Sequence, residues 1–235
     1  MKKVIHKANT RGHADHGWLK SFHTFSFAGY YDPERVHFGL LRVLNDDIIE
    51  GGRGFGKHPH DNMEIVSIPL YGALAHKDST GREKVIHTND VQIMSAGKGI
   101  AHSEFNASET DNANFLQIWV FPKEKNIEAR YEQKTFDPKE RQNKFQTVVS
   151  PEDKEAVWIN QDAYFSLGNL EEGKALDYKI HKSGNGVYAF VINGKAKIEG
   201  EALQKRDAVG ISETDSLHIE ATSETEILLI EVPMN

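Results

Sequence analysis

The sequence contains no cysteine. This absence excludes disulfide scaffolds, thiolate nucleophiles, iron–sulfur clusters and cysteine zinc sites, so any bound metal must be held by nitrogen and oxygen atoms. The sequence also lacks an apolar run long enough to cross a bilayer, and its basic start is followed by no stretch of signal-peptide length. We therefore expect a cytoplasmic protein without a membrane-spanning segment.

Positive charge is also scarce. Lysine and arginine number 28 against 35 aspartate and glutamate residues, which gives a formal net charge of -7. A protein without a basic field attracts phosphates poorly, so we expect no direct nucleic-acid partner, whereas protein partners stay open. The chain of 235 residues is long enough for one large domain or two smaller ones.

Long helical patterns are missing, and the apolar residues come in short runs broken by Gly, Asp and Asn. These runs are rich in Val, Ile, Phe and Trp and recur at nearly regular spacing. They indicate antiparallel β structure, as in a sandwich or barrel, with helices only minor. The clearest runs cover residues 37–44, 64–72, 90–97, 114–122, 186–194 and 225–233.

A faint internal repeat divides the chain. Gly72 and Asp90 open turns between apolar runs in the first half, and Gly194 and Asp207 do so in the second half. Two copies of one small barrel would give this order. The charged segment 121–145 contains prolines and suits a surface connection, so we predict domains at 1–130 and 131–235.

Two short segments concentrate potential metal ligands, GKHPHDNME (56–64) and GKGIAHSEFN (97–106). Side chains alternate between the two faces of a strand, so His58 and His60 point the same way, as do His102 and Glu104. Glu64 is in phase with the first pair unless a bulge intervenes. Facing strands would then bring three imidazoles and a carboxylate together, which is the composition of a metal site.

The spacing of these segments is similar to the motifs of the cupin superfamily. Residues 52–72 match its first motif closely, and residues 99–106 match the end of its second motif. The departures are small. Seven residues rather than six separate Glu64 from Gly72, and Gly97 stands where many cupins have proline.

A closer resemblance is to the pirin family, specifically its short bacterial branch that resembles quercetin 2,3-dioxygenases. It is carried by RGHADHGWLKSFHTFSFAGYYDP (11–33), RVLNDD, GFGKHPHDNMEIV and QIMSAGKGIAHSEFN. It extends over most of the first 135 residues and is faint in the second half, where it rests on RYEQKTF and general length. The resemblance implies an all-β fold of two tandem cupin barrels, each a double-stranded β-helix or jelly roll.

The family's metal ligands, carried over position by position, fall on His58, His60, His102 and Glu104. Many other cupins take their carboxylate from the first motif, where Glu64 stands. The pirin resemblance implies Glu104 as the ligand and Glu64 as a neighbour, and either one is a candidate proton acceptor in catalysis. We expect one divalent ion per chain, with iron(II) favoured and nickel, manganese, copper, cobalt and zinc as alternatives.

The remaining histidines and the pocket are assigned from their positions along the chain. We expect packing and pocket-wall roles in the N-terminal loop and strand, solvent exposure at the turn 77–82, and no metal in the second barrel, where two histidines stand without a partner motif. The residues concerned are His13, His16 and His23, then His76 and His87, then His181 and His218. We expect Gln117, Phe27, Met94 and Asn106 to line the substrate pocket and Trp119 to pack in the core.

The resemblance implies a dioxygenase that acts on a flavonol such as quercetin. Four protein ligands on an octahedral metal leave two positions open. The flavonol 3-hydroxyl would bind there and lose its proton, dioxygen would open the central ring, and carbon monoxide would leave. Two alternatives stay open: a metal-binding regulator that acts through protein partners, and an oxygenase for another enediol or aromatic substrate. We expect a monomer.

Overall fold

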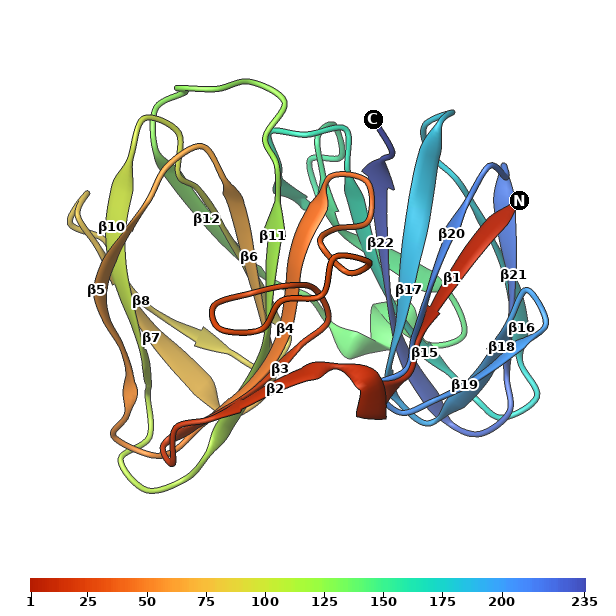
Figure 1. The fold of residues 1–235 in the computed structure, drawn as a ribbon, viewed down its shortest axis with the longest axis horizontal. Helices are drawn as coiled ribbons and strands as arrows, with labels where there is room; N and C mark the ends of the chain where they lie inside the picture. Colours follow the sequence, from red (N-terminus) through yellow and green to blue (C-terminus); the bar gives the residue numbers. More distant parts are fainter.

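The computed structural model describes residues 1–235 as two β barrels that lie side by side (Figure 1). Each barrel consists of a seven-stranded and a four-stranded sheet, in which all but one of the neighbouring strands pair antiparallel. The only helices are the short 3-10 turns η1 (Ala8–Thr10) and η2 (Pro138–Arg141). The predicted all-β architecture of two jelly-roll barrels is confirmed.

The N-terminal barrel combines the sheet β12-β9-β6-β11-β4-β3-β2 with the sheet β5-β10-β7-β8. The strand bounds are β2 Gly12–Asp15, β3 Leu19–His23, β4 Leu41–Ile49, β5 Gly54–His60, β6 Glu64–Tyr71, β7 Ala73–Asp78, β8 Glu83–His87, β9 Asp90–Ser95, β10 Ile100–Asn106, β11 Ala113–Val120 and β12 Arg130–Thr135.

The C-terminal barrel repeats this plan with the sheets β1-β20-β17-β22-β15-β13-β14 and β16-β21-β18-β19. The bounds are β1 Lys2–His6, β13 Phe145–Ser150, β14 Val157–Trp158, β15 Tyr164–Leu170, β16 Ala175–Lys179, β17 Asn185–Asn193, β18 Lys195–Ile198, β19 Glu201–Gln204, β20 Ala208–Ser212, β21 Ser216–Ala221 and β22 Thr225–Pro233.

The repeat places strands of the two halves in equivalent positions. Gly72 precedes β7 and Gly194 precedes β18, each with a positive φ that glycine adopts without strain. The edge strand of the second large sheet is β1, which lies among the blue strands in Figure 1 and is equivalent to β12 in the first sheet. The start of the chain therefore completes the C-terminal barrel. The division at residue 130 stays a prediction.

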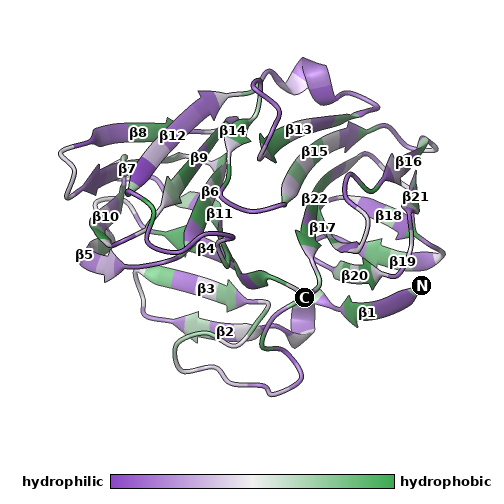
Figure 2. Ribbon diagram, turned by 90° about the horizontal axis from the view of Figure 1, so that it is seen from above, coloured by the Kyte–Doolittle hydropathy of each residue, from purple (hydrophilic) through white to green (hydrophobic).

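The two large sheets face each other and form the seam between the barrels. Alternate residues of their central strands, such as Val66 and Ile118 on one side and Phe190 and Leu228 on the other, belong to one cluster of 26 buried residues. In Figure 2 the strands β17 and β22 in the middle of the molecule are largely hydrophobic, whereas β5 at the outer rim is hydrophilic. The intervening residues of each strand point into their own barrel.

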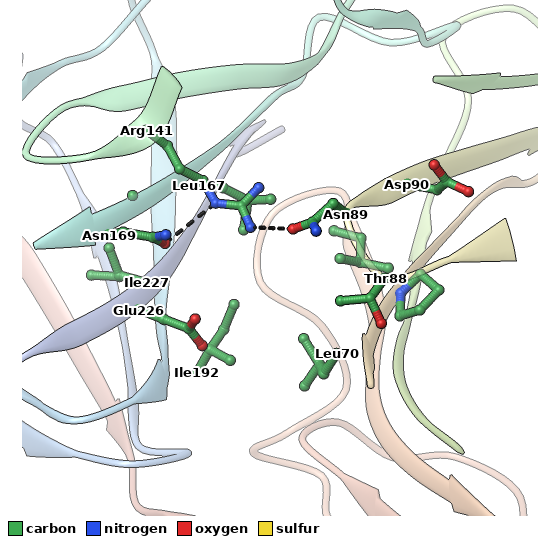
Figure 3. A pocket seen from close by; sticks show the side chains of 13 residues that line it. Leu70, Thr88, Asn89, Asp90, Arg141, Leu167, Asn169, Ile192, Glu226 and Ile227 are labelled. Carbon is green, nitrogen blue, oxygen red and sulfur yellow. Dashed lines mark hydrogen bonds between the residues drawn. The ribbon is translucent and has the colours of Figure 1, made fainter. Parts of the chain in front are cut away.

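The seam also contains a small pocket of about 80 Å³ (Figure 3). Arg141 spans it, donating from Nη2 to Asn89 Oδ1 at 2.8 Å and from Nε to Asn169 Oδ1 at 3.3 Å. The pocket is crossed by these hydrogen bonds and holds no cluster of metal-binding side chains, so its polar groups tie the two barrels together. None of the helices is long and apolar enough to span a membrane.

Candidate metal centre

The three predicted histidine ligands lie on two paired strands at the outer side of the N-terminal barrel. β5 and β10 pair antiparallel with His58 directly opposite His102, and His60 follows two residues along β5 on the same face. The ring centroids of His58, His60 and His102 are 4.5 to 4.9 Å apart. A shift in register between His102 and Glu104 marks a bulge in this strand pair.

The imidazole nitrogens are placed as ligands of one ion would be. His60 Nε2 and His102 Nε2 are 3.0 Å apart. Two ligand atoms about 2.1 Å from one ion and at right angles to each other would be roughly 3 Å apart. His58 Nδ1 lies 2.8 Å from the carbonyl oxygen of Gly56, to which it can donate, leaving its Nε2 free. These residues fit a divalent metal.

Burial keeps His60 and His102 neutral, which is the form that binds metals. Desolvation, followed by the charge of neighbouring imidazoles, lowers the pKa of His60 to about 4 and that of His102 to about 3. An unprotonated imidazole has a lone pair available at neutral pH, and a cation replaces the proton that burial has removed. The electrostatics therefore favour a bound cation over protonated imidazoles.

Glu104 lies beside the histidines and is fixed by two polar neighbours. Gln117 Nε2 donates to Glu104 Oε2 at 2.8 Å, and Ser67 Oγ lies 3.2 Å from Glu104 Oε1 and 3.0 Å from Gln117 Oε1. Burial raises the pKa of Glu104 to about 7. Its carboxylate atoms cluster with His76 and His102, rather than with the group of His58, His60 and His102.

His58, His60 and Glu104 border a cavity of about 680 Å³ inside the N-terminal barrel. This volume lies in the range of roughly 300–1,000 Å³ that is typical of small-molecule sites. Gln117 and Phe27 line the cavity. The full lining comprises His13, Ala14, His16, Leu19, Ser21, His23, Phe27, Ala28, Gly29, Tyr30, Asn45, Asp47, Phe55, His58, His60, Glu104, Gln117 and Trp119.

Three predicted positions were wrong: two residues expected in the pocket lie outside it, and one residue expected in the core lines it. Met94 is fully buried in a separate apolar cluster with Ile65 and Ile100. Asn106 donates from Nδ2 to the carbonyls of Ile49 and Asp111 and so fixes a turn outside the cavity. Trp119, expected in the core, lines the cavity, and its ring meets that of His60 edge to face at 5.0 Å.

Glu64 does not lie beside the metal ligands, contrary to the prediction. Asn62, between β5 and β6, has φ 44, so a turn interrupts the alternation on which the phase of Glu64 depended. Glu64 is fully buried at the seam, where Ser95 Oγ donates to it at 2.7 Å and the backbone N–H of Asn160 donates at 3.1 Å. It therefore joins the two barrels instead of serving the cavity.

Among the other histidines with a predicted position, His76 lies elsewhere than expected. His13, His16 and His23 line the cavity wall, and His87 is exposed. His76, which was expected in solvent, is 1% exposed because β7 places it opposite Glu104 on β10. Sequence reasoning treated the turn 77–82 as the end of an exposed hairpin, but the strand before this turn faces inward.

Sequence reasoning missed the polar residues that β4 contributes to the cavity. Asn45 and Asp47 alternate on the inward face of this strand, and Asp47 accepts a short hydrogen bond from Ser21. Burial raises the pKa of Asp47 to about 7. Asn45, Asp46 and Asp47 are three consecutive polar residues in RVLNDD (42–47), directly after an apolar run, and this is the signal that could have pointed to a polar interior.

Comparison with known proteins agrees with this fold. Residues 4–120 match the family model described as Pirin, and residues 147–232 match that described as Quercetinase C-terminal cupin domain. A protein named quercetin 2,3-dioxygenase from Escherichia coli strain K12 is 41% identical over 230 residues, covering 97% of this chain and 98% of that protein. A pirin-like protein from Caulobacter vibrioides is 38% identical over 222 residues, covering 94% and 95% of the two chains.

A solved structure is equally similar. The crystal structure of the bacterial pirin YhhW from Escherichia coli, in complex with nickel(II), superimposes with a TM-score of 0.93 at 40% identity and covers 99% of both chains. That protein binds a divalent metal in the same fold. From relatives of this identity along nearly its whole length, we conclude that the chain belongs to the pirin family.

Proposed function

We propose that the protein is a metal-dependent dioxygenase of the quercetinase type, which cleaves the heterocyclic ring of a flavonol with dioxygen and releases carbon monoxide. The observation that carries the proposal is the group of His58, His60 and His102 at the edge of a cavity large enough for an aromatic substrate, which His58, His60 and Glu104 line. The relatives named quercetin 2,3-dioxygenase support the same substrate class.

The ligands we propose are His58, His60, His102 and Glu104, with one divalent ion per chain. Iron(II) is our favoured ion, and the nickel(II) bound by the pirin YhhW supports a first-row divalent metal. When bound, such an ion acts as a Lewis acid and lowers the pKa of a hydroxyl that coordinates it. Ser67 and Gln117 hydrogen-bond the Glu104 carboxylate, and each of its oxygens retains a further lone pair with which it can bind an ion.

The protein's own residues supply substrate binding and proton acceptance. Phe27 and Trp119, whose rings meet edge to face at 5.4 Å, form an apolar wall for an aromatic substrate. Glu104 and Asp47, both held near neutral pKa by burial, are positioned on the cavity to accept a proton from the substrate hydroxyl at neutral pH. Asp47 replaces Glu64 as the second candidate acceptor, because Glu64 lies at the seam.

The test is oxygen uptake together with gas analysis for carbon monoxide, using metal-reconstituted protein and quercetin. We expect dioxygen consumption and carbon monoxide release with quercetin, and little of either with the analogue that lacks the 3-hydroxyl or with the His60→Ala protein. Absence of carbon monoxide from every metal-reconstituted form would reject the quercetinase proposal in favour of a metal-binding regulator. Faster turnover of another enediol would instead reassign the physiological substrate.

A further inference from the structure

We propose that His76 and Asp78 position the metal ligand His102, by a chain of hydrogen bonds that holds its proton on Nδ1 and leaves Nε2 bare for the metal. His76 and Asp78 are then positioning residues that act through His102. The inference rests on the metal site proposed above, and it does not depend on which substrate the protein turns over.

The three side chains form a continuous chain behind the metal site. His102 Nδ1 lies 3.4 Å from His76 Nδ1, and His76 Nε2 lies 3.3 Å from Asp78 Oδ2. The second ring nitrogen of His102, Nε2, points toward the proposed metal position and lies 3.0 Å from Nε2 of His60. All three side chains are buried, with exposed fractions of 2% for His102, 1% for His76 and 7% for Asp78.

Strand geometry fixes this arrangement. β7 pairs antiparallel with β10, so that His76 is opposite Glu104 and Asp78 is opposite His102. Because side chains alternate along a strand, His76 and Asp78 share the inward face of β7 with Leu74. The ring of Tyr131 packs against that of His76, with centroids 4.9 Å apart. The ring of His76 therefore contacts both Tyr131 and His102.

The position of every proton in the chain follows from its acidic end. An ionised carboxylate only accepts hydrogen bonds, so His76 must hold its proton on Nε2 to donate to Asp78. His76 Nδ1 is then a lone pair, which requires His102 to donate from Nδ1. The Nε2 of His102 is left without a proton on the side that faces His58 and His60. Such outer partners commonly fix the tautomer of a metal-binding histidine.

Asp78 is itself held in place by the turn that follows it. Its Oδ1 accepts from the backbone N–H groups of Thr80, at 2.8 Å, and Arg82, at 3.3 Å. These bonds occupy one oxygen and leave Oδ2 to accept from His76. Oδ1 therefore anchors the turn, and Oδ2 accepts from His76 on the side of the metal site.

The C-terminal barrel shows that the fold itself does not need this chain of hydrogen bonds. The position equivalent to His76 in β18 is Ile198, which is opposite Ile219 on β21 just as His76 is opposite Glu104 on β10. Both isoleucines are fully buried in the apolar cluster of that barrel. At this position, the barrel with the proposed metal ligands has a buried imidazole hydrogen-bonded to a carboxylate. The other barrel has an aliphatic residue there.

One competing arrangement uses the same atoms. His76, His102 and Glu104 form a second group whose ligand atoms lie within 4.8 Å of one another. If His76 were a ligand of a second ion, His102 would have to bind metals through both nitrogens. The hydrogen-bonded chain needs no such bridging imidazolate, and it uses His76 Nε2 for Asp78 as observed.

The experiment measures the dissociation constant of nickel(II) by competition with a chromophoric chelator, on full-length wild type, Asp78→Asn, His76→Phe and the double variant. The amide that Asp78→Asn introduces can donate to His76 Nε2 and so reverse the tautomer of His76, while His76→Phe keeps an aromatic ring under Tyr131. We expect roughly 10- to 100-fold weaker nickel binding in each single variant, with stoichiometry unchanged. We expect no further weakening in the double variant, because both changes break the same chain.

Asp90→Asn is the matched control, because Asp90 also anchors a turn of the same barrel, accepting from the N–H of His87 at 2.8 Å. It should leave nickel affinity unchanged. In cobalt(II)-loaded wild type, the exchangeable imidazole proton of His102 should give a shifted NMR signal that is lost in His76→Phe. Folding of each metal-free variant is checked by its thermal transition.

The possible results separate the claims. Nickel affinity within about threefold of wild type in the folded single variants, well short of the expected weakening, would overturn the positioning role alone. Additive effects in the double variant would also overturn the positioning role. So would binding of two ions per wild-type chain, if the His76→Phe variant lost one of them. Failure of the wild type to bind nickel, cobalt or iron at all would instead remove the proposed metal site and this inference with it.

Discussion

The two barrels have the same strand plan but opposite interiors. In the C-terminal barrel, a cluster of 16 buried apolar residues fills the space between the sheets. In the N-terminal barrel, the apolar residues inside form only two small clusters of five and four, and the barrel contains a cavity of about 680 Å³. One copy of the fold is packed, and the other is hollow.

The difference lies in the residues at equivalent inward positions. Leu229 and Ala189, paired on β22 and β17, correspond to Gln117 and Ser67, paired on β11 and β6. Tyr178 and Leu217, paired on β16 and β21, correspond to His58 and His102 on β5 and β10. The backbone therefore tolerates either interior, and the site results from replacing core side chains with ligands and polar residues. The seam, which both barrels share, supplies stability to the hollow one.

The largest expected effect is the loss of metal from the hollow barrel alone. His102→Ala and His58→Ala should reduce the bound divalent metal from about one ion per chain to nearly none, because each removes a ligand that no neighbour replaces. Elemental analysis after dialysis measures this. His218→Ala, which removes an exposed imidazole from β21 of the packed barrel, is the control and should retain full occupancy. Full occupancy in the first two variants would disprove the site.

The packed interior should be more sensitive to truncation than the hollow one. Leu229→Ala should lower the free energy of unfolding by about 2–5 kcal/mol, because it leaves a cavity in a filled core. Gln117→Ala, at the equivalent position, should cost less than half as much, because its space joins an existing cavity. Chemical denaturation of the metal-free proteins measures both. Equal losses would show that the cavity wall is packed as tightly as a core.

Ionisation of Glu104 should make the metal-free hollow barrel less stable as pH rises. Burial raises its pKa from 4.5 to about 7 in the folded state, so the folded protein binds more protons than the unfolded chain between these values. Stability from this group is complete below pH 4.5 and is lost by about pH 7, and the total is on the order of 3 kcal/mol.

The Glu104→Gln variant cannot ionise, so it isolates this contribution. Its stability relative to wild type should increase from pH 4.5 to about pH 7 in metal-free protein. Thermal melts across this range, with chelator present, test the sign. A constant difference between the two proteins would mean that Glu104 is ionised throughout, as a permanently charged acceptor of Gln117.

The smallest effect is expected from Glu64→Gln. Because Glu64 lies at the seam and bonds with Ser95 and Asn160, the variant should keep its metal and its activity and lose at most about 1 kcal/mol of stability. Glu104→Gln should instead weaken metal binding and activity together. Metal analysis of the two variants side by side decides the matter, and the reverse pattern would assign the ligand carboxylate to the first motif.

The site was predictable where it depended on short-range geometry. The spacing of His58 and His60, and of His102 and Glu104, needs only the alternation of side chains along a strand to bring each pair onto one face. The prediction for Glu64 failed because it extended the alternation of side chains across a break between two strands. Asn62 turns the chain between β5 and β6 and sends Glu64 to the opposite face, which no spacing rule anticipates.

Pairing between distant strands explains what the sequence left hidden. His76 looked like a residue beside an exposed turn, and its role depends on β7 pairing with β10, which brings it opposite Glu104. Asp47 reaches the cavity because β4 lies beside β11, with Ser21 on β3 as its partner. Such contacts depend on sheet order, and the local sequence does not encode it.

The sequence by itself determined the β class, the duplication, the absence of thiolate chemistry and two histidine motifs with the spacing of metal ligands, because composition, turn residues and strand periodicity are local properties. Only the tertiary structure decided which carboxylate faces those histidines, which barrel is hollow, and where the start of the chain lies. These depend on register and on the face of each sheet that is buried at the seam. A one-residue change of phase moves a side chain from the cavity to the opposite face.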